Sequence, residues 1–290
     1  MSILSPLFRI IGALGLTVAL AGCSAFKLGY SHLPDLAYWW LDGYFQFNEA
    51  QAPRVKEELA RLHLWHRQNE LPRVAELLRR AEQMGPSDIS AAQACAVLTD
   101  ARQRVAAVSR QAEPAVAAVA AGFGAHQLQQ LARRNERNNA EFRRDWIDVA
   151  PAERLDKRYK QFEERLERIY GRLEPAQRDS LRRALESSAY DPARWFAERQ
   201  RRQADLADTL LRLQAPGLPQ AEALRLVRGY VDRVETSPDP AWRSHAQTLT
   251  QEGCALYAAV HNAATPAQRQ GAVNRLRAYQ RDLSDLAVRP

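Results

Sequence analysis

Apolar residues recur every three or four positions along most of the chain, separated by arginine, glutamate and glutamine. Because a helical turn takes about 3.6 residues, this spacing gathers the apolar side chains on one helix face. No alternating apolar and polar run of strand length appears. The clearest stripes are Val55-Leu59-Leu62-His66, Tyr159-Phe162-Leu166-Ile169-Leu173, Leu224-Val227-Val231-Val234 and Val273-Leu276-Tyr279-Leu283-Leu286. The pattern predicts an all-α protein.

Glycine and proline separate the predicted helices at Gly85-Pro86-Ser87, Gly122-Phe123-Gly124, Tyr190-Asp191-Pro192, Ala215–Pro219 and Ser237–Pro240. Thr265-Pro266-Ala267-Gln268 has the form of a helix start, in which Thr caps, Pro takes the first position and Gln bonds back. No long flexible linker interrupts residues 48–287. We therefore expect a single multi-helix bundle of about nine amphipathic helices, with residues 48–290 as one helical domain.

The first 22 residues have the pattern of a signal peptide. Arg9 is followed by an apolar run, Ile10–Ala21, which is shorter than the roughly 20 residues that a membrane span needs. The run ends in Leu20-Ala21-Gly22-Cys23, the pattern of a bacterial lipobox, so we expect cleavage after residue 22 and lipid attachment at Cys23. Ser24, where an Asp would favour the inner membrane, favours the outer membrane. The alternative is an ordinary secretory signal with a chance cysteine.

Composition adds a basic character that comes almost wholly from arginine. The net charge is +7, and cleavage after residue 22 would remove only Arg9. Export rules out nucleic acid as a partner, which leaves lipid headgroups, lipopolysaccharide phosphates and cell-wall carboxylates as acidic partners. The competing interpretation is that these arginines are solvated helix faces interspersed with Glu and Asp.

Two cysteines remain after lipidation of Cys23. Cys95 shares a stripe with Leu98 and Val105, and Cys254 follows Gly253, where a small residue allows another helix to come close. An exported chain meets an oxidising compartment, so we predict a disulfide between Cys95 and Cys254. Two separately buried free thiols are the alternative.

An aromatic segment close to the lipid site, within residues 23–47, is the first candidate for function. It holds Trp39 and Trp40, with Asp35 and Asp42 nearby. Tryptophan and tyrosine suit the headgroup layer of a membrane, which would make the segment an interfacial belt. It could also form a ligand or peptide groove with Asp35 and Asp42 at its rim. The third interpretation is a short core helix whose large side chains close the bundle.

Two further groups carry polar side chains at core-facing positions. His63 and His66 share a helix face, but no third ligand, HExxH motif or Cys pair accompanies them, so we expect no metal site. Asn135 and Asn138 interrupt the stripe between Leu131 and Phe142. Buried amides need partners, so this face either meets a polar network, lines a wet cleft or is exposed; we favour the network.

A set of short motifs is spread over most of the chain: Cys23, Lys27-Leu28-Gly29-Tyr30, Asp35, Trp39-Trp40-Leu41-Asp42, Tyr44, Trp65-His66-Arg67, Glu70-Leu71-Pro72, Asn139-Ala140-Glu141-Phe142, Gly171-Arg172-Leu173, Gln177 and Thr265–Gln268. These motifs resemble a family of proteobacterial helical lipoproteins of unknown function, which implies an all-α fold but supplies no activity or catalytic residues. A weaker likeness is to envelope-stress chaperones with a Leu-Thr-x-x-Gln motif at helix starts, which Leu173–Gln177 and Ala264–Gln268 match in part.

No nucleophile elbow, phosphate-binding glycine loop or paired carboxylate pattern is present in the sequence. We expect a non-enzymatic lipoprotein on the periplasmic face of the envelope, which binds a protein partner as an adaptor or chaperone-like module. The alternatives are a structural subunit of an outer-membrane or cell-wall assembly, and an envelope hydrolase that uses His63, His66 or the Asp35 and Asp42 region. The sequence indicates no cofactor and no small-molecule substrate.

Overall fold

The computed structural model describes residues 27–288, so Cys23 and the expected signal peptide lie outside the described part of the chain. Within residues 27–288 the fold is all-α, as predicted, and contains no strand. The helices are α2 (Leu33–Phe45), α3 (Gln51–Trp65), α4 (Leu71–Met84), α5 (Ala91–Ala120), α6 (Ala125–Phe142), α7 (Pro151–Tyr170), α8 (Pro175–Glu186), α9 (Pro192–Leu213), α10 (Gln220–Glu235), α11 (Pro240–Asn262) and α12 (Pro266–Val288).

These eleven α-helices exceed the nine that the periodicity predicted. One reason is that α3 and α4 form one continuous rod, divided by a π-helical turn at His66–Glu70. Pro72 follows this turn and has no N–H to donate to the carbonyl four residues earlier, which interrupts the regular α-helical ladder. A second π-helical turn, Arg143–Ile147, extends α6 in the same way.

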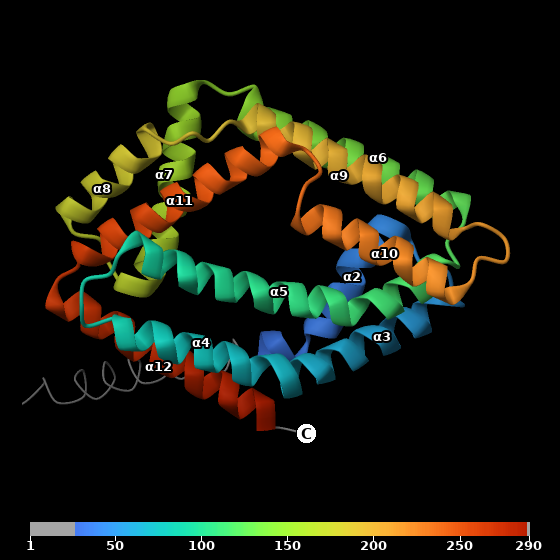
Figure 1. Cartoon of the computed structure of the whole chain (residues 1–290), viewed down its shortest axis with the longest axis horizontal. Helices are drawn as coiled ribbons and strands as arrows, with labels where there is room; N and C mark the ends of the chain where they lie inside the picture. Colours follow the sequence, from blue (N-terminus) through green and yellow to red (C-terminus); the bar gives the residue numbers. More distant parts are fainter. Residues whose placement is uncertain (1–26, 289–290) are drawn as a thin grey trace, which may run out of the picture.

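The long helix α5 lies along the middle of the molecule (Figure 1). Helices α7, α8 and α11 gather at one end of it, and α2, α3, α6, α9 and α10 at the other, while α4 and α12 pack side by side along one edge. Ser90 starts α5 through a capping box with Gln93. The 30-residue length of α5 lets it contact α11 near one end and α10 near the other.

The buried apolar side chains form two main clusters, one at each end of α5. The first joins the end of α5 to α6, α9 and α10, and the second joins α7, α8, α11 and α12. Their buried members are Ala117, Ala120, Phe123, Leu131, Leu210, Leu213, Ala223, Leu226 and Val227 in the first, and Leu166, Tyr170, Leu173, Leu181, Leu185, Leu256, Val260, Ala264 and Ala272 in the second.

A disulfide between Cys95 and Cys254 ties α5 to α11, with the two Cα atoms 5.3 Å apart. It lies in a smaller apolar cluster with Ile89, Ala94 and Ala258. The bond closes a sequence separation of 159 residues. It therefore holds together segments that are far apart in the chain.

The two helix starts that resemble the chaperone motif meet each other. Gln177 Oε1 accepts from the backbone N–H of Glu174 at 2.9 Å, and Gln268 Oε1 accepts from that of Thr265 at 3.0 Å, which are capping-box bonds. Gln268 Nε2 also donates to Gln177 Oε1 at 2.9 Å, and Gln177 Nε2 donates to the carbonyl of Val260 at 3.1 Å. These glutamines therefore cap and join helices inside the fold.

Candidate functional site

The aromatic helix α2 has two different faces. Tyr44 and Phe45 pack against the first core cluster, where Phe45 meets Phe123 with ring centroids 4.9 Å apart. Trp39 is 77% exposed and Trp40 is 58% exposed, and the Trp40 ring meets the Tyr44 ring with centroids 4.8 Å apart. No residue of α2 is fully buried. The interpretation of this segment as a core helix is therefore wrong for both tryptophans.

The exposed side of α2 is continuous. Leu33, Leu36, Trp39 and Trp40 lie three or four positions apart, so they share one side of the helix, and Leu36 is 54% exposed. We call these four residues the α2 face. Singly exposed apolar residues are ordinary, but a contiguous apolar patch marks a protein or membrane contact.

The two aspartates of α2 do not form a joint site. Asp42 Oδ1 accepts from the backbone N–H of Phe47 at 2.9 Å, which helps to end the helix at Gln46, a residue in the left-handed region with φ 49°. The Asp35 carboxylate lies 3.8 Å from His32 Nδ1, and its side chain is 80% exposed. Asp42 is thus occupied by a structural bond, while Asp35 stands at the solvent edge of the α2 face.

The histidines of the π-turn region are tied to Tyr30. The Tyr30 hydroxyl and His66 Nδ1 are hydrogen-bonded at 2.7 Å, and the rings of Tyr30 and His63 lie 4.6 Å apart. Burial lowers the pKa of both histidines and raises the pKa of Tyr30 to about 12. No cluster of three His, Cys, Asp or Glu able to hold a metal ion occurs within residues 27–288.

The asparagines of α6 lie in half-buried positions, where two of them make specific bonds. Asn138 Nδ2 donates to the Tyr44 hydroxyl at 2.9 Å, which links α6 to α2. Asn139, which the stripe analysis did not single out, exchanges hydrogen bonds with Gln203 of α9 at 2.8 and 3.1 Å. Asn135 lines a surface hollow beside Asn139. The partners come from distant segments, so the periodicity of α6 alone could not identify them.

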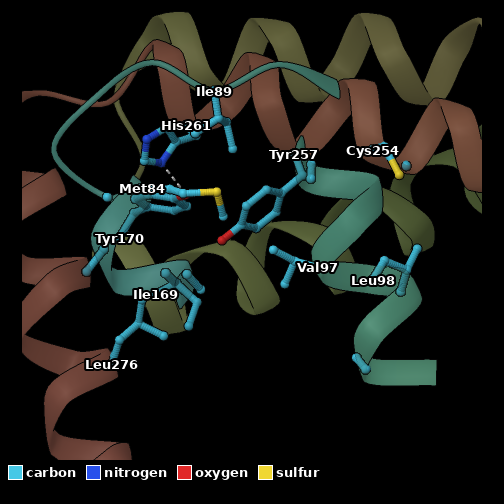
Figure 2. A pocket seen from close by; sticks show the side chains of 16 residues that line it. Met84, Ile89, Val97, Leu98, Ile169, Tyr170, Cys254, Tyr257, His261 and Leu276 are labelled. Atoms are coloured by element: carbon cyan, nitrogen blue, oxygen red, sulfur yellow. Dashed lines mark hydrogen bonds between the residues drawn. The ribbon is translucent and has the colours of Figure 1, made fainter. Parts of the chain in front are cut away.

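An apolar cavity of about 450 Å³ lies between α4, α5, α7, α11 and α12. We call it the Tyr257 cavity, because Figure 2 shows the Tyr257 ring in the middle of the lining side chains. Among the described residues that line it, none is Asp, Glu, Lys or Arg. Its larger lining side chains are Met84, Ile89, Val97, Leu98, Ile169 and Leu276.

A short chain of polar groups closes one side of the Tyr257 cavity. His261 Nε2 lies 2.9 Å from the carbonyl of Ser87, which can only accept, so Nε2 carries a proton. In the neutral ring Nδ1 is then the acceptor, and the Tyr170 hydroxyl donates to it at 2.9 Å. Burial raises the pKa of Tyr170 far above its ordinary value. These groups therefore have partners within the protein, and neither His261 nor Tyr170 was singled out from the sequence.

A second apolar cavity, of about 360 Å³, lies beneath α2. It is lined by Phe45, Phe47 and Phe123 together with side chains of α3 and α5. The core-facing side of α2, rather than the α2 face, therefore borders the space between α3 and α5.

No helix among residues 27–288 combines the length and hydropathy of a membrane span. The disulfide is typical of proteins located outside the cytoplasm, because the cytosol keeps thiols reduced. It therefore suggests an extracytoplasmic location for this chain.

No curated protein and no solved structure matches the chain. A family model does match, over residues 43–228, which begins in α2 and ends in α10. The whole α2 face precedes the matched segment, whereas His63, His66 and the asparagines of α6 lie within it. The chain belongs to the family of unknown function DUF6279.

Proposed function

We propose that this chain is a lipoprotein of the bacterial envelope, anchored through Cys23 and seated on the membrane by the α2 face. Its helical domain then faces the periplasm and works by binding a partner rather than by catalysis. Ser24 after the lipidated cysteine favours the outer membrane by the sorting rule. The observation that carries the proposal is the exposure of Trp39 and Trp40 on a helix that begins ten residues after Cys23.

The chemistry of the α2 face suits a lipid headgroup layer. Tryptophan combines a large apolar ring with one N–H donor, and it is enriched where an apolar and a wet phase meet. Basic groups lie beside this helix: the Lys56 ammonium is 4.6 Å from the centre of the Tyr38 ring, and the Arg134 guanidinium is 5.4 Å from that of Tyr44. Tyr44 contacts Trp40, so Arg134 lies next to the α2 face, and a cation in that place favours anionic lipids.

A binding role is supported by what the polar groups of the candidate sites already do. The imidazoles of His66 and His261 bond to tyrosine hydroxyls, and Asp42 caps α2. A general base must instead reach a proton on its substrate. The two apolar cavities offer contact surface without charged groups of catalytic type, except for Glu58 and Arg61 at the second one.

The anchor is tested by labelling a Gram-negative host that expresses the full chain with radioactive palmitate. The wild-type chain should take up label, and Cys23→Ser should take up none and retain its signal peptide. Equal labelling of Cys23→Ser would contradict the lipid assignment.

The seating on the membrane is tested separately with chains that begin at residue 23 and carry Cys23→Ser, so that no lipid contributes. We expect Leu36→Ser to lower partitioning into phosphatidylethanolamine–phosphatidylglycerol vesicles about tenfold, because burying a leucine contributes about 1.5–3 kcal/mol. The matched control is Leu211→Ser, since Leu211 is 60% exposed but lies on α9. Equal loss in both variants, or crosslinking of the α2 face to one fixed protein with no vesicle binding, would overturn this seating and favour a subunit of an envelope assembly.

A further inference from the structure

We propose that the Tyr257 cavity binds a hydrocarbon chain, namely the acyl chain of a lipid. The cavity is open to solvent on one side and offers an almost wholly apolar lining around a space of about 450 Å³. It falls in the size range of small-molecule pockets. The cavity is distinct from the α2 face, and binding there goes beyond the anchoring role proposed above.

Small residues keep this space open. Six of its 16 lining residues are Gly or Ala: Ala81 in α4, Gly85 directly after α4, Ala94 and Ala101 in α5, Gly253 in α11 and Ala272 in α12. The disulfide of Cys254, itself a lining residue, fixes the separation of α5 and α11 beside the cavity. At Gly85 a Cβ atom would come within 2.6 Å of Val273 Cγ2, so α4 and α12 are already as close as they can pack there. The disulfide and the close contact at Gly85 therefore limit how far these helices can move together to fill the cavity.

The lining selects an uncharged and largely apolar ligand. No Asp, Glu, Lys or Arg belongs to the described residues that surround the cavity, and the buried His261 and Tyr170 are bonded to each other. A phosphate or sugar would lose its water there without finding partners, which costs free energy. A methylene chain has no polar groups that would need hydrogen-bond partners in the cavity. Tyr257 is 40% exposed, so the cavity reaches water beside this residue, and the ester or carboxyl end of an acyl chain can stay solvated there. In Figure 2 the hydroxyl of Tyr257 is turned toward the side on which Tyr170 and Ile169 lie.

The chain carries an acyl source within reach. The Lys27 ammonium forms ion pairs with Asp282 at 3.2 Å and Asp285 at 2.6 Å on α12, the helix that also supplies Leu276 to the cavity. Six residues of helix separate Leu276 from Asp282, or about 9 Å. Four residues of chain separate Cys23 from Lys27 and span at most about 14 Å. An acyl group on Cys23 can therefore reach the cavity, as can the chain of another lipid, and this first source alone rests on the proposed lipidation.

Binding is tested with the chain from residue 23 that carries Cys23→Ser, which keeps every residue that the structure describes, and with the fluorescent fatty acid cis-parinaric acid. We expect saturable binding without vesicles. Gly253→Leu should weaken it at least tenfold, because a side chain at Gly253 meets no atom within 4 Å and projects into open space. Gly271→Leu is the matched control, since Gly271 also lies inside a helix with nothing within 4 Å but does not line the cavity. Melting curves of both variants establish that they fold.

A second variant, Leu98→Asp, places a carboxylate on the lining at a residue that is 36% exposed, and it should also weaken binding at least tenfold. Absence of saturable binding, or binding that Gly253→Leu and Leu98→Asp leave unchanged, would overturn the proposal; the latter result would place the probe elsewhere on the protein. The same probe, added to the lipidated protein, distinguishes the two sources of the acyl chain. If the lipidated protein does not bind the probe, its own anchor fills the cavity. If the lipidated protein binds the probe as the Cys23→Ser chain does, the ligand is another lipid. Neither result depends on how α2 meets a membrane.

Discussion

Removing the disulfide should cost this fold a large part of its stability. A crosslink restricts the unfolded chain, and the effect grows with the number of residues in the loop that it closes. For the separation of 159 residues between Cys95 and Cys254, the chain-entropy relation gives about 5 kcal/mol at 25 °C. Cys254 is only 3% exposed, so alanine is the replacement that disturbs its apolar surroundings least. We therefore expect the free energy of unfolding of Cys95→Ala/Cys254→Ala to fall by about 5 kcal/mol.

The measurement is urea denaturation followed by circular dichroism, for the oxidised wild type, the double variant and the wild type in reductant. The reduced wild type is the control, and it should unfold at nearly the same urea concentration as the double variant, because both lack the crosslink. If the free energy of unfolding falls by less than about 2 kcal/mol in both the double variant and the reduced wild type, the expectation is wrong. It would mean that α5 and α11 stay close in the unfolded chain without the bond.

Three other changes test single contacts. Asn138→Ala removes the donor to the Tyr44 hydroxyl and should lower the free energy of unfolding by about 1–3 kcal/mol, as read from denaturation curves; an unchanged curve would place this amide in a binding cleft. Burial lowers the pKa of His66 below 6.5, so the unfolded state takes up the proton first as the pH falls. The stability of the wild type should therefore fall as the pH drops below 6.5, and that of His66→Gln should fall less. A melting temperature that stays constant between pH 7 and 5 would contradict this prediction. Gly171 has a φ of 74°, which alanine adopts only at a cost, so Gly171→Ala should lower the free energy of unfolding by about 1 kcal/mol. Gly271→Ala, inside α12, should leave the free energy of unfolding unchanged or raise it. Equal effects of the two substitutions in calorimetry would show that backbone conformation is not the cause.

The helical periodicity was sufficient to predict the fold class and much of the core. Leu166 and Leu173 of one predicted stripe and Leu283 and Leu286 of another are all buried. A single helix face needs only local spacing to be recognised, which is why these positions could be read from the chain alone. The π-helical turn at His66–Glu70 could not, since it depends on how Pro72 is accommodated within a longer helix.

The polar interior and the cavities depend on contacts between distant segments. Glu70 is fully buried, where Arg73 and Arg104 supply its ion pairs at 3.0 and 3.5 Å, and no local pattern indicates that Arg104 lies opposite it. Trp39 and Trp40 are apolar side chains that are exposed, whereas Glu70 is a charged side chain that is buried. Their hydrophobicity favours burial, but no other described segment of the chain covers that side of α2.

In the proposed arrangement the α2 face lies in the headgroup layer of the membrane that holds the lipid anchor. The most direct measurement is quenching of tryptophan fluorescence by brominated lipids, with the lipidated protein reconstituted in vesicles and compared with Trp39→Phe/Trp40→Phe. We predict strong quenching in the wild type by lipids brominated near the headgroup, and its loss in the double variant, since the other four of the six tryptophans do not belong to this face. Equal quenching in the two proteins, or none in either, would contradict the account.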